Sequence, residues 1–293
     1  MRAITAEANV GAFSDYIALT KPRITTLVLA TTLVGFYLAS QANLDLFLLV
    51  HTLLGTALVA AGASALNMAL EWEPDSRMRR TENRPIPAGR VSLLQGFAFG
   101  SGISLFGLVY LWMLVNWLTS LLALITVSLY LFAYTPLKRK TWWCTLVGAV
   151  PGAIPPLMGW AAVRESLSVP ALWLFAVLFF WQLPHFFAIA WIYREDYARG
   201  GFPMLPVVDP EGIRTGRHIV LGTLALLMVS LIPVRVGVFH QAYFWGACFL
   251  GSLFLVAAVR LVRERSNASA RRLLLASVFY LPLLLILIMI GKV

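Results

Sequence analysis

Three oxygen-bearing side chains recur every four residues where an apolar stretch ends: Asn67, Glu71 and Asp75. Residues four apart share a helix face, about 6 Å apart along the axis, although Pro74 is expected to end or kink the helix before Asp75. One amide and two carboxylates at one spot suit Mg²⁺, which prefers carboxylate oxygens together with substrate phosphates. The alternative is a solvated loop with ordinary surface ion pairs. We favour a functional site because polar groups inside a membrane-like stretch usually have a function.

Arginines follow this acidic set, and a second acidic set ends a later apolar stretch. Arg80 and Arg84 come after Asp75, and guanidinium groups match phosphate oxygens. The second set consists of Glu195 and Asp196, flanked by Arg194 and Arg199. Two acidic helix ends that face each other could hold two Mg²⁺ ions bridging one diphosphate. Both sets lead into a proline-containing exit, at residues 84–87 and 202–206. This layout predicts a parallel duplication with the site at its interface.

A third candidate group is Tyr134 and Lys138, four residues apart at the end of another apolar stretch. Both side chains could reach the same diphosphate, although Pro136 between them disturbs simple helical alignment. The alternative is a basic anchor with an interfacial tyrosine, which we prefer for Arg139 and Lys140.

The elements that must position these residues are membrane helices. The chain has 293 residues, 60% hydrophobic and only 12% charged, with a net charge of +10 and a mean hydropathy of +0.81. Soluble domains carry about 25% charged residues, disordered chains have few aromatics, and disulfide scaffolds need more than two cysteines. The basic excess is therefore assigned to loops of a polytopic membrane protein rather than to a nucleic-acid surface.

Nine apolar segments are long enough to cross about 30 Å of hydrocarbon, and their continuous apolar character favours helices over a β-barrel. The sequence thus predicts an all-α polytopic membrane protein whose single transmembrane domain covers 1–293, with spans at roughly 24–41, 47–70, 91–114, 117–135, 144–163, 170–192, 218–237, 242–261 and 273–290. Three prolines within residues 151–156 predict a broken fifth span, either a tolerated kink or the wall of a cavity.

The basic residues fall almost entirely on one side of these spans. Of the 23 lysines and arginines, all lie on that side except Arg164, Arg235 and Lys292. By the positive-inside rule, the N-terminus and the acidic sets face the cytoplasm. No cleavable signal or transit peptide is visible, which favours a bacterial plasma (inner) membrane.

Taken together, these motifs resemble those of the intramembrane prenyltransferases of the UbiA family. The segment 67–85 resembles the first family motif, in the form found in the protohaem IX farnesyltransferase branch, which also has Glu at the position of Glu71. Supporting matches are Leu19–Arg23, Tyr134 with Lys138, Trp181 with Pro184–Phe186, Asp196–Tyr197 and Pro203–Pro206. In the second family motif, a carboxylate four residues after Asp196 is replaced here by Gly200.

The resemblance implies a UbiA-type bundle that transfers a farnesyl group from farnesyl diphosphate to the 2-vinyl group of haem b, with addition of water. It implies Asn67, Tyr134 and Lys138 as catalytic residues and Mg²⁺ held by Glu71, Asp75 and Asp196. The residues expected to bind the diphosphate are Arg80, Arg84, Lys138 and Arg199. For haem, the candidates are His185, Lys21 and Arg23. A neighbouring helix could instead satisfy His185. Haem A synthase or a terminal oxidase assembly would be transient partners.

Two other functions remain open at this point. One is a UbiA-type prenyltransferase with another aromatic acceptor, such as 4-hydroxybenzoate; the segment around His185 argues against it. The other is a transporter of an anionic amphiphile, which would use the same basic face but would not need carboxylates at two helix ends.

Overall fold

The computed structural model describes residues 12–40, 43–235 and 240–291. Within these ranges it is all-helical, and nine segments are long and apolar enough to cross a membrane. They are Pro22–Ala39 (α2), Leu46–Leu70 (α3), Leu93–Leu114 (α5), Trp117–Lys138 (α6, η1 and α7), Cys144–Arg164 (α8 and α9), Val169–Ile192 (α10), Ile213–Val234 (within α13, Ile213–Arg235), Gln241–Glu264 (α14) and Asn267–Ile290 (α15).

All nine predicted spans are confirmed, with two helices that begin earlier than expected. The seventh helix begins at Ile213 instead of 218 and the ninth at Asn267 instead of 273. Both helices have arginines near their N-terminal ends, so the continuous apolar stretch in the sequence begins later than the helix does. Polar caps fix the true starts: Asp209 Oδ2 accepts from the Thr215 amide at 2.7 Å, and Ser266 forms a capping box with Ser269. Positions 41 and 236–237 and the residues Arg2 and Lys292 lie outside the described residues.

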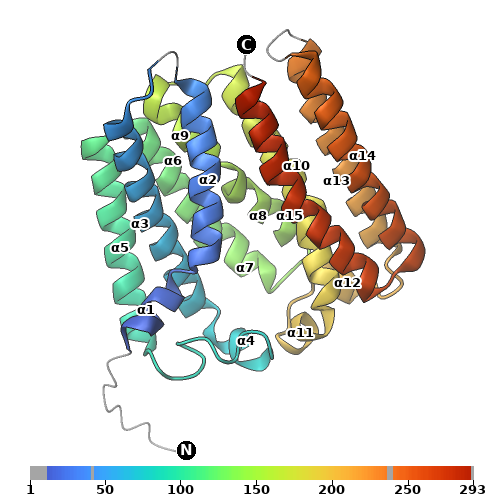
Figure 1. Ribbon diagram of the computed structural model, residues 1–293. Helices are drawn as coiled ribbons and strands as arrows, with labels where there is room; N and C mark the ends of the chain where they lie inside the picture. The colour runs from blue at the N-terminus through green and yellow to red at the C-terminus, as the bar shows by residue number, and fades with distance from the viewer. Residues whose placement is uncertain (1–11, 41–42, 236–239, 292–293) are drawn as a thin grey trace, which may run out of the picture.

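Short helices gather at one end of the bundle, where α1 (Phe13–Leu19), α4 (Trp72–Arg77), α7 (Thr135–Lys138), α11 (Arg194–Arg199) and α12 (Leu205–Val208) come together (Figure 1). The helices α2, α3, α5 and α6 (Trp117–Ser128) stand on one side of the bundle, and α10, α13, α14 and α15 stand on the other (Figure 1). In the fifth span, α8 (Cys144–Ala153) lies between the two groups, and α9 (Pro155–Arg164) lies beside α2 and α6 (Figure 1). Both acidic sets therefore lie at the same end of the molecule.

The helix α3 breaks at Glu71, three residues before Pro74. Glu71 has φ −100° and ψ 12°, and a new helix, α4, starts at Trp72 with Pro74 in its first turn. Proline lacks the N–H that would bond the carbonyl of Leu70. The Arg139 guanidinium donates to that carbonyl instead, at 3.1 Å. The sequence prediction of a break near Pro74 is confirmed, and Asp75 lies in the short helix that follows the break.

The fourth span contains a wide turn that sets the direction of Tyr134. After α6, the π-helical segment η1 (Leu129–Tyr134) leads into α7. Thr135 donates through its hydroxyl and its amide to the carbonyl of Tyr130, at 2.9 Å for the hydroxyl. Pro136 is the second residue of α7, in the first turn, where its missing N–H costs little. The π-helical turn η1 thus accommodates Pro136, and the helical path continues from Tyr134 to Lys138.

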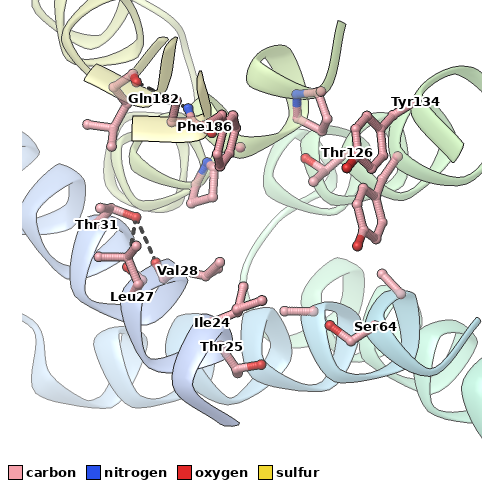
Figure 2. A pocket seen from close by; sticks show the side chains of 18 of the residues that line it. Ile24, Thr25, Leu27, Val28, Thr31, Ser64, Thr126, Tyr134, Gln182 and Phe186 are labelled. Atoms are coloured by element: carbon pink, nitrogen blue, oxygen red, sulfur yellow. Dashed lines mark hydrogen bonds between the residues drawn. The ribbon is translucent and has the colours of Figure 1, made fainter. Parts of the chain in front are cut away.

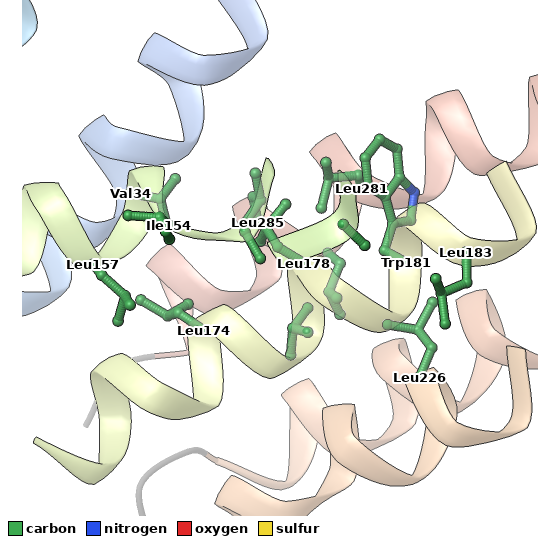
Figure 3. Close-up of a cluster of buried hydrophobic side chains, with 14 of the residues drawn as sticks. Val34, Ile154, Leu157, Leu174, Leu178, Trp181, Leu183, Leu226, Leu281 and Leu285 are labelled. Carbon is green, nitrogen blue, oxygen red and sulfur yellow. The ribbon is translucent and has the colours of Figure 1, made fainter. Parts of the chain in front are cut away.

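The fifth span is broken, as predicted. Cys144–Ala153 (α8) and Pro155–Arg164 (α9) meet at Ile154. A core of buried side chains surrounds this break; Figure 3 shows Ile154 and Leu157 near Leu174 and Leu178 of α10. Trp181 of α10 is also buried and donates from Nε1 to the Ser277 carbonyl of α15 at 2.9 Å. This core holds α10 and α15 against the fifth span.

Candidate functional site

A largely apolar cavity of about 440 Å³ opens among α2, α3, the fourth span, α8 and α10. Figure 2 shows Ile24, Val28 and Thr31 of α2 on one wall, with Gln182 and Phe186 of α10 opposite. Tyr134 lies at the end of the cavity where the short helices gather. The cavity joins an apolar interior to the polar residues predicted to do chemistry.

Asn67 connects three elements of the structure. It is 3% exposed, and its Oδ1 accepts a hydrogen bond from Lys21 Nζ at 2.9 Å. Its Nδ2 donates to Thr135 Oγ1 at 3.1 Å. Asn67 therefore ties the start of α2 and the start of α7 to the end of α3.

Glu71 forms a buried ion pair with Lys138, 2.8 Å between Oε2 and Nζ. Burial acts to raise the pKa of Glu71, but the Lys138 ammonium and its hydrogen bond outweigh burial and lower the pKa. The carboxylate is therefore charged. Its other oxygen, Oε1, is buried and has no hydrogen-bond donor among the described residues. A buried charged oxygen without a partner is costly, and a cation beside it would remove that cost.

Asp75 lies one helical turn further on and is 1% exposed. Its Oδ2 pairs with the Arg84 guanidinium at 2.5 Å, and its backbone carbonyl accepts from the Thr81 hydroxyl at 2.8 Å. With Glu71, it provides carboxylate oxygens of the kind that Mg²⁺ prefers. The first acidic set therefore fits a divalent cation shared with a phosphate group.

The second acidic set, at the end of α10, is built around Asp196. Asp196 is buried, and its Oδ1 accepts from Arg199 and from the Arg79 amide, the latter at 3.3 Å. In the part of the chain that the structure describes, no three His, Cys, Asp or Glu side chains converge as metal ligands. Asp196 is held toward the segment after α4 and pairs with Arg199, so its role as a third Mg²⁺ ligand beside Glu71 and Asp75 stays a prediction.

His185 fits both of the alternatives considered for it. Its Nδ1 lies 2.7 Å from Ser277 Oγ of a neighbouring helix, and its ring stacks on Trp181 with centroids 4.9 Å apart. It also lines the cavity. A polar partner thus fixes the ring in a position where it still faces the interior.

Lys21 and Arg23, the other two haem candidates, lie in different surroundings. Lys21 reaches the first acidic set through Asn67. Burial, followed by the nearby Arg84 charge, lowers the pKa of Lys21 to about 7. Arg23 is exposed on α2. The structure groups Lys21 with the residues proposed for the diphosphate and leaves Arg23 outside that group.

Several residues of the site carry no strong signal in the sequence. Thr135 holds Asn67, and Tyr130 stacks on Tyr134 with centroids 5.5 Å apart. Tyr193 and Tyr197 hold Arg80, whose guanidinium carbon lies 4.8 Å and 5.5 Å from their ring centroids. The four-residue spacing of each tyrosine pair was a signal that could have found them.

The fold and the site together define a multi-pass membrane protein in which a charged cluster lies next to Tyr134, a residue that lines an apolar cavity. The model of the UbiA prenyltransferase family matches residues 28–283. The chain belongs to this family, and it is a prenyltransferase.

Its curated relatives are similar over nearly their whole length. The protoheme IX farnesyltransferase of Solibacter usitatus is 47% identical over 95% of this chain and 98% of the relative. That of Opitutus terrae is 43% identical over 98% of both chains.

Solved structures share the fold at low sequence identity. A digeranylgeranylglyceryl phosphate synthase matches with a TM-score of 0.79 at 17% identity, over 95% of this chain and 97% of that one. A UbiA homologue from Archaeoglobus fulgidus, bound to GPP and Mg²⁺, matches with a TM-score of 0.66 at 15% identity, over 94% of this chain and 99% of that one. These matches confirm the UbiA-type helical bundle.

Proposed function

We propose that the chain transfers a farnesyl group from farnesyl diphosphate to the 2-vinyl group of haem b, with addition of water, to make haem O. The activity in the names of its relatives supports this acceptor. The observation that carries the proposal is the buried Glu71–Lys138 pair next to Tyr134, a residue that lines the apolar cavity. This arrangement suits an ionising diphosphate and a long apolar chain.

Glu71 and Asp75 would hold Mg²⁺ in this reaction. The unpartnered Glu71 Oε1 supports this assignment. When bound, Mg²⁺ would neutralise diphosphate oxygens and so stabilise pyrophosphate as a leaving group. The Archaeoglobus fulgidus homologue, which binds GPP and Mg²⁺, is consistent with such a site.

The cations of this chain would bind the diphosphate directly. Lys138 and Arg84 already lie beside Glu71 and Asp75, and Lys21 is hydrogen-bonded to Asn67. Each keeps N–H groups that can donate to phosphate oxygens. Such preorganised donors stabilise the charge that develops as the allylic C–O bond breaks.

The apolar cavity would protect the farnesyl cation from water until it meets its acceptor. The farnesyl C1 bonds to the terminal vinyl carbon of haem b, and the resulting cation beside the porphyrin ring takes up water and loses a proton. His185 faces this interior and is proposed as a haem contact, with Arg23 nearer the surface for a propionate.

The proposed location is the bacterial inner membrane, with the site facing the cytoplasm. The strong bias of basic residues toward one side supports this orientation. Transient contact with haem A synthase or a terminal oxidase assembly would then pass haem O onward.

The test is an assay of purified membranes with farnesyl diphosphate, Mg²⁺ and haem b. We expect a haem heavier by one farnesyl group and one water, detected by mass spectrometry of extracted haems. The variant His185→Ala should lose this product while still binding farnesyl diphosphate. Unchanged haem together with a prenylated 4-hydroxybenzoate would favour the other aromatic acceptor. Uptake of an anionic amphiphile without any covalent product would favour a transporter.

A further inference from the structure

The two short helices that carry the acidic sets follow the same design. Each long helix, α3 or α10, is broken by one residue and continues as a helix of six residues that ends in arginine. The break residues have nearly the same conformation: φ −100° and ψ 12° at Glu71, and φ −106° and ψ 23° at Tyr193. The backbone therefore defines which residues of α4 and α11 are equivalent.

This equivalence places tyrosines where the first set has carboxylates. Tyr193 corresponds to Glu71, and Tyr197, four residues later, corresponds to Asp75. Asp196 comes one position before Tyr197, about 100° around the helix from it. The acidic residue of the second set is thus not the counterpart of either carboxylate in the first.

The two tyrosines hold a cation instead of providing carboxylates for one. The Arg80 guanidinium carbon lies 4.8 Å from the Tyr193 ring centroid and 5.5 Å from that of Tyr197. Arg80 Nη2 also donates to Tyr197 Oη at 3.3 Å. Across the described residues, Arg80 forms no ion pair with a carboxylate, and it lines the cavity. Contact with ring faces leaves its positive charge available to an anion.

The remaining acids of α11 are poorly placed to bind a metal ion. Asp196 is neutralised by Arg199 and accepts from the Arg79 amide through the same oxygen. Glu195 is exposed. The second half of the site therefore presents a net positive surface to the cavity, which a second divalent cation would not favour.

We infer that this enzyme uses one divalent cation per chain, at Glu71 and Asp75, and that Arg80 on its tyrosine platform takes the place of a second metal ion. Arg80 would bind the side of the diphosphate that faces α11. The inference rests on the proposed binding of a prenyl diphosphate, and it replaces the expectation of two Mg²⁺ ions bridging that group.

The number of ions can be counted without any turnover. Mn²⁺ binds the same oxygen ligands as Mg²⁺ and is visible by electron paramagnetic resonance. The full chain in detergent would be titrated with Mn²⁺ in the presence of farnesyl thiodiphosphate. This analogue keeps the charged diphosphate, but its allylic C–S bond does not break. We expect one bound Mn²⁺ per chain in the wild type and in Asp196→Asn, and none in Glu71→Gln.

The outcomes separate the inference from the function on which it rests. Two bound Mn²⁺ ions, one of which disappears in Asp196→Asn, would overturn the inference and leave prenyl diphosphate binding intact. If the wild type bound no farnesyl thiodiphosphate at all, the proposed function would fail together with the inference.

The tyrosine platform has its own test, with affinity for farnesyl thiodiphosphate as the readout. A phenylalanine ring keeps the face that holds Arg80, so Tyr193→Phe should bind nearly as well as the wild type. Tyr193→Leu and Arg80→Leu should bind about 3- to 30-fold more weakly, as expected for a lost cation–π contact or phosphate contact. Arg77→Leu is the matched control, because Arg77 pairs with Glu73 on the exposed surface. Equal loss in Tyr193→Phe and Tyr193→Leu, with a lower Mn²⁺ count, would make Tyr193 a metal ligand and contradict the inference.

Discussion

Lys21 shows how much a single residue of this site depends on its surroundings. It adopts a left-handed backbone conformation with φ 48°, unusual for a residue that is not glycine. Such a conformation costs about 1–3 kcal/mol and persists where neighbouring contacts enforce it. Here Asn67 binds the ammonium group, and Pro22 follows in the chain and disfavours the right-handed helical conformation.

The charge of Lys21 should make diphosphate binding depend on pH. With a pKa of about 7, the ammonium form that attracts phosphate is lost as the pH rises from about 6 to about 8. The affinity of farnesyl thiodiphosphate, measured by calorimetry, should therefore decline across this range relative to Lys21→Arg, whose guanidinium stays charged. Parallel pH profiles of the two proteins would contradict this assignment.

The same lowered pKa predicts the sign of an effect on stability. Below about pH 7, Lys21 is charged in both the folded and the unfolded chain, and its burial cost is fully present. Between about 7 and the ordinary value of 10.5, the unfolded chain binds more protons, so this residue's contribution to stability improves as the pH rises.

At the scale of the elements, close contact between α2 and α9 holds the broken fifth span in place. A side chain at Gly159 would place its Cβ 1.9 Å from the Thr32 carbonyl oxygen, and one at Gly35 would lie 2.0 Å from that of Pro156. Small residues allow membrane helices to approach until their backbones touch. These two glycines thus position the cavity wall formed by α2.

Replacing one of these glycines should destabilise the bundle. Gly159→Ala forces two backbones apart, and overpacking of this kind costs about 1–3 kcal/mol. We expect a lower melting temperature in detergent. Gly102→Ala on α5 is the control, because its added Cβ meets nothing within 4 Å; it should have no effect or a slight stabilising one. Equal melting temperatures for the two variants would show that α2 and α9 are not tightly packed.

At the scale of the whole molecule, nine spans place the start of α2 and the end of α15 at opposite ends of the bundle (Figure 1). The short helices of the site share the end where α2 begins (Figure 1). The distribution of basic residues supports the proposal that the site faces the cytoplasm, in which case the end of α15 would lie on the other side of the membrane.

Reporter fusions test this orientation. Alkaline phosphatase joined after Val293 should be active, because the enzyme requires the periplasm, whereas green fluorescent protein at that position should stay dark. Fusions after Arg265, in the turn between α14 and α15, should give the opposite pattern. The reverse result at both positions would place the site outside the cytoplasm.

The sequence by itself determined the nine spans, because apolar length is a local property that the bilayer imposes on each segment. From their four-residue spacing it also predicted Asn67, Glu71, Asp75, Tyr134 and Lys138 as site residues. Only the tertiary structure decided which charges pair, since Lys138 reaches Glu71 and Lys21 reaches Asn67 from distant parts of the chain. It also paired Asp196 with Arg199 and gave Tyr193 and Tyr197 a partner in Arg80. Those contacts depend on how α4 and α11 meet, which no local pattern encodes.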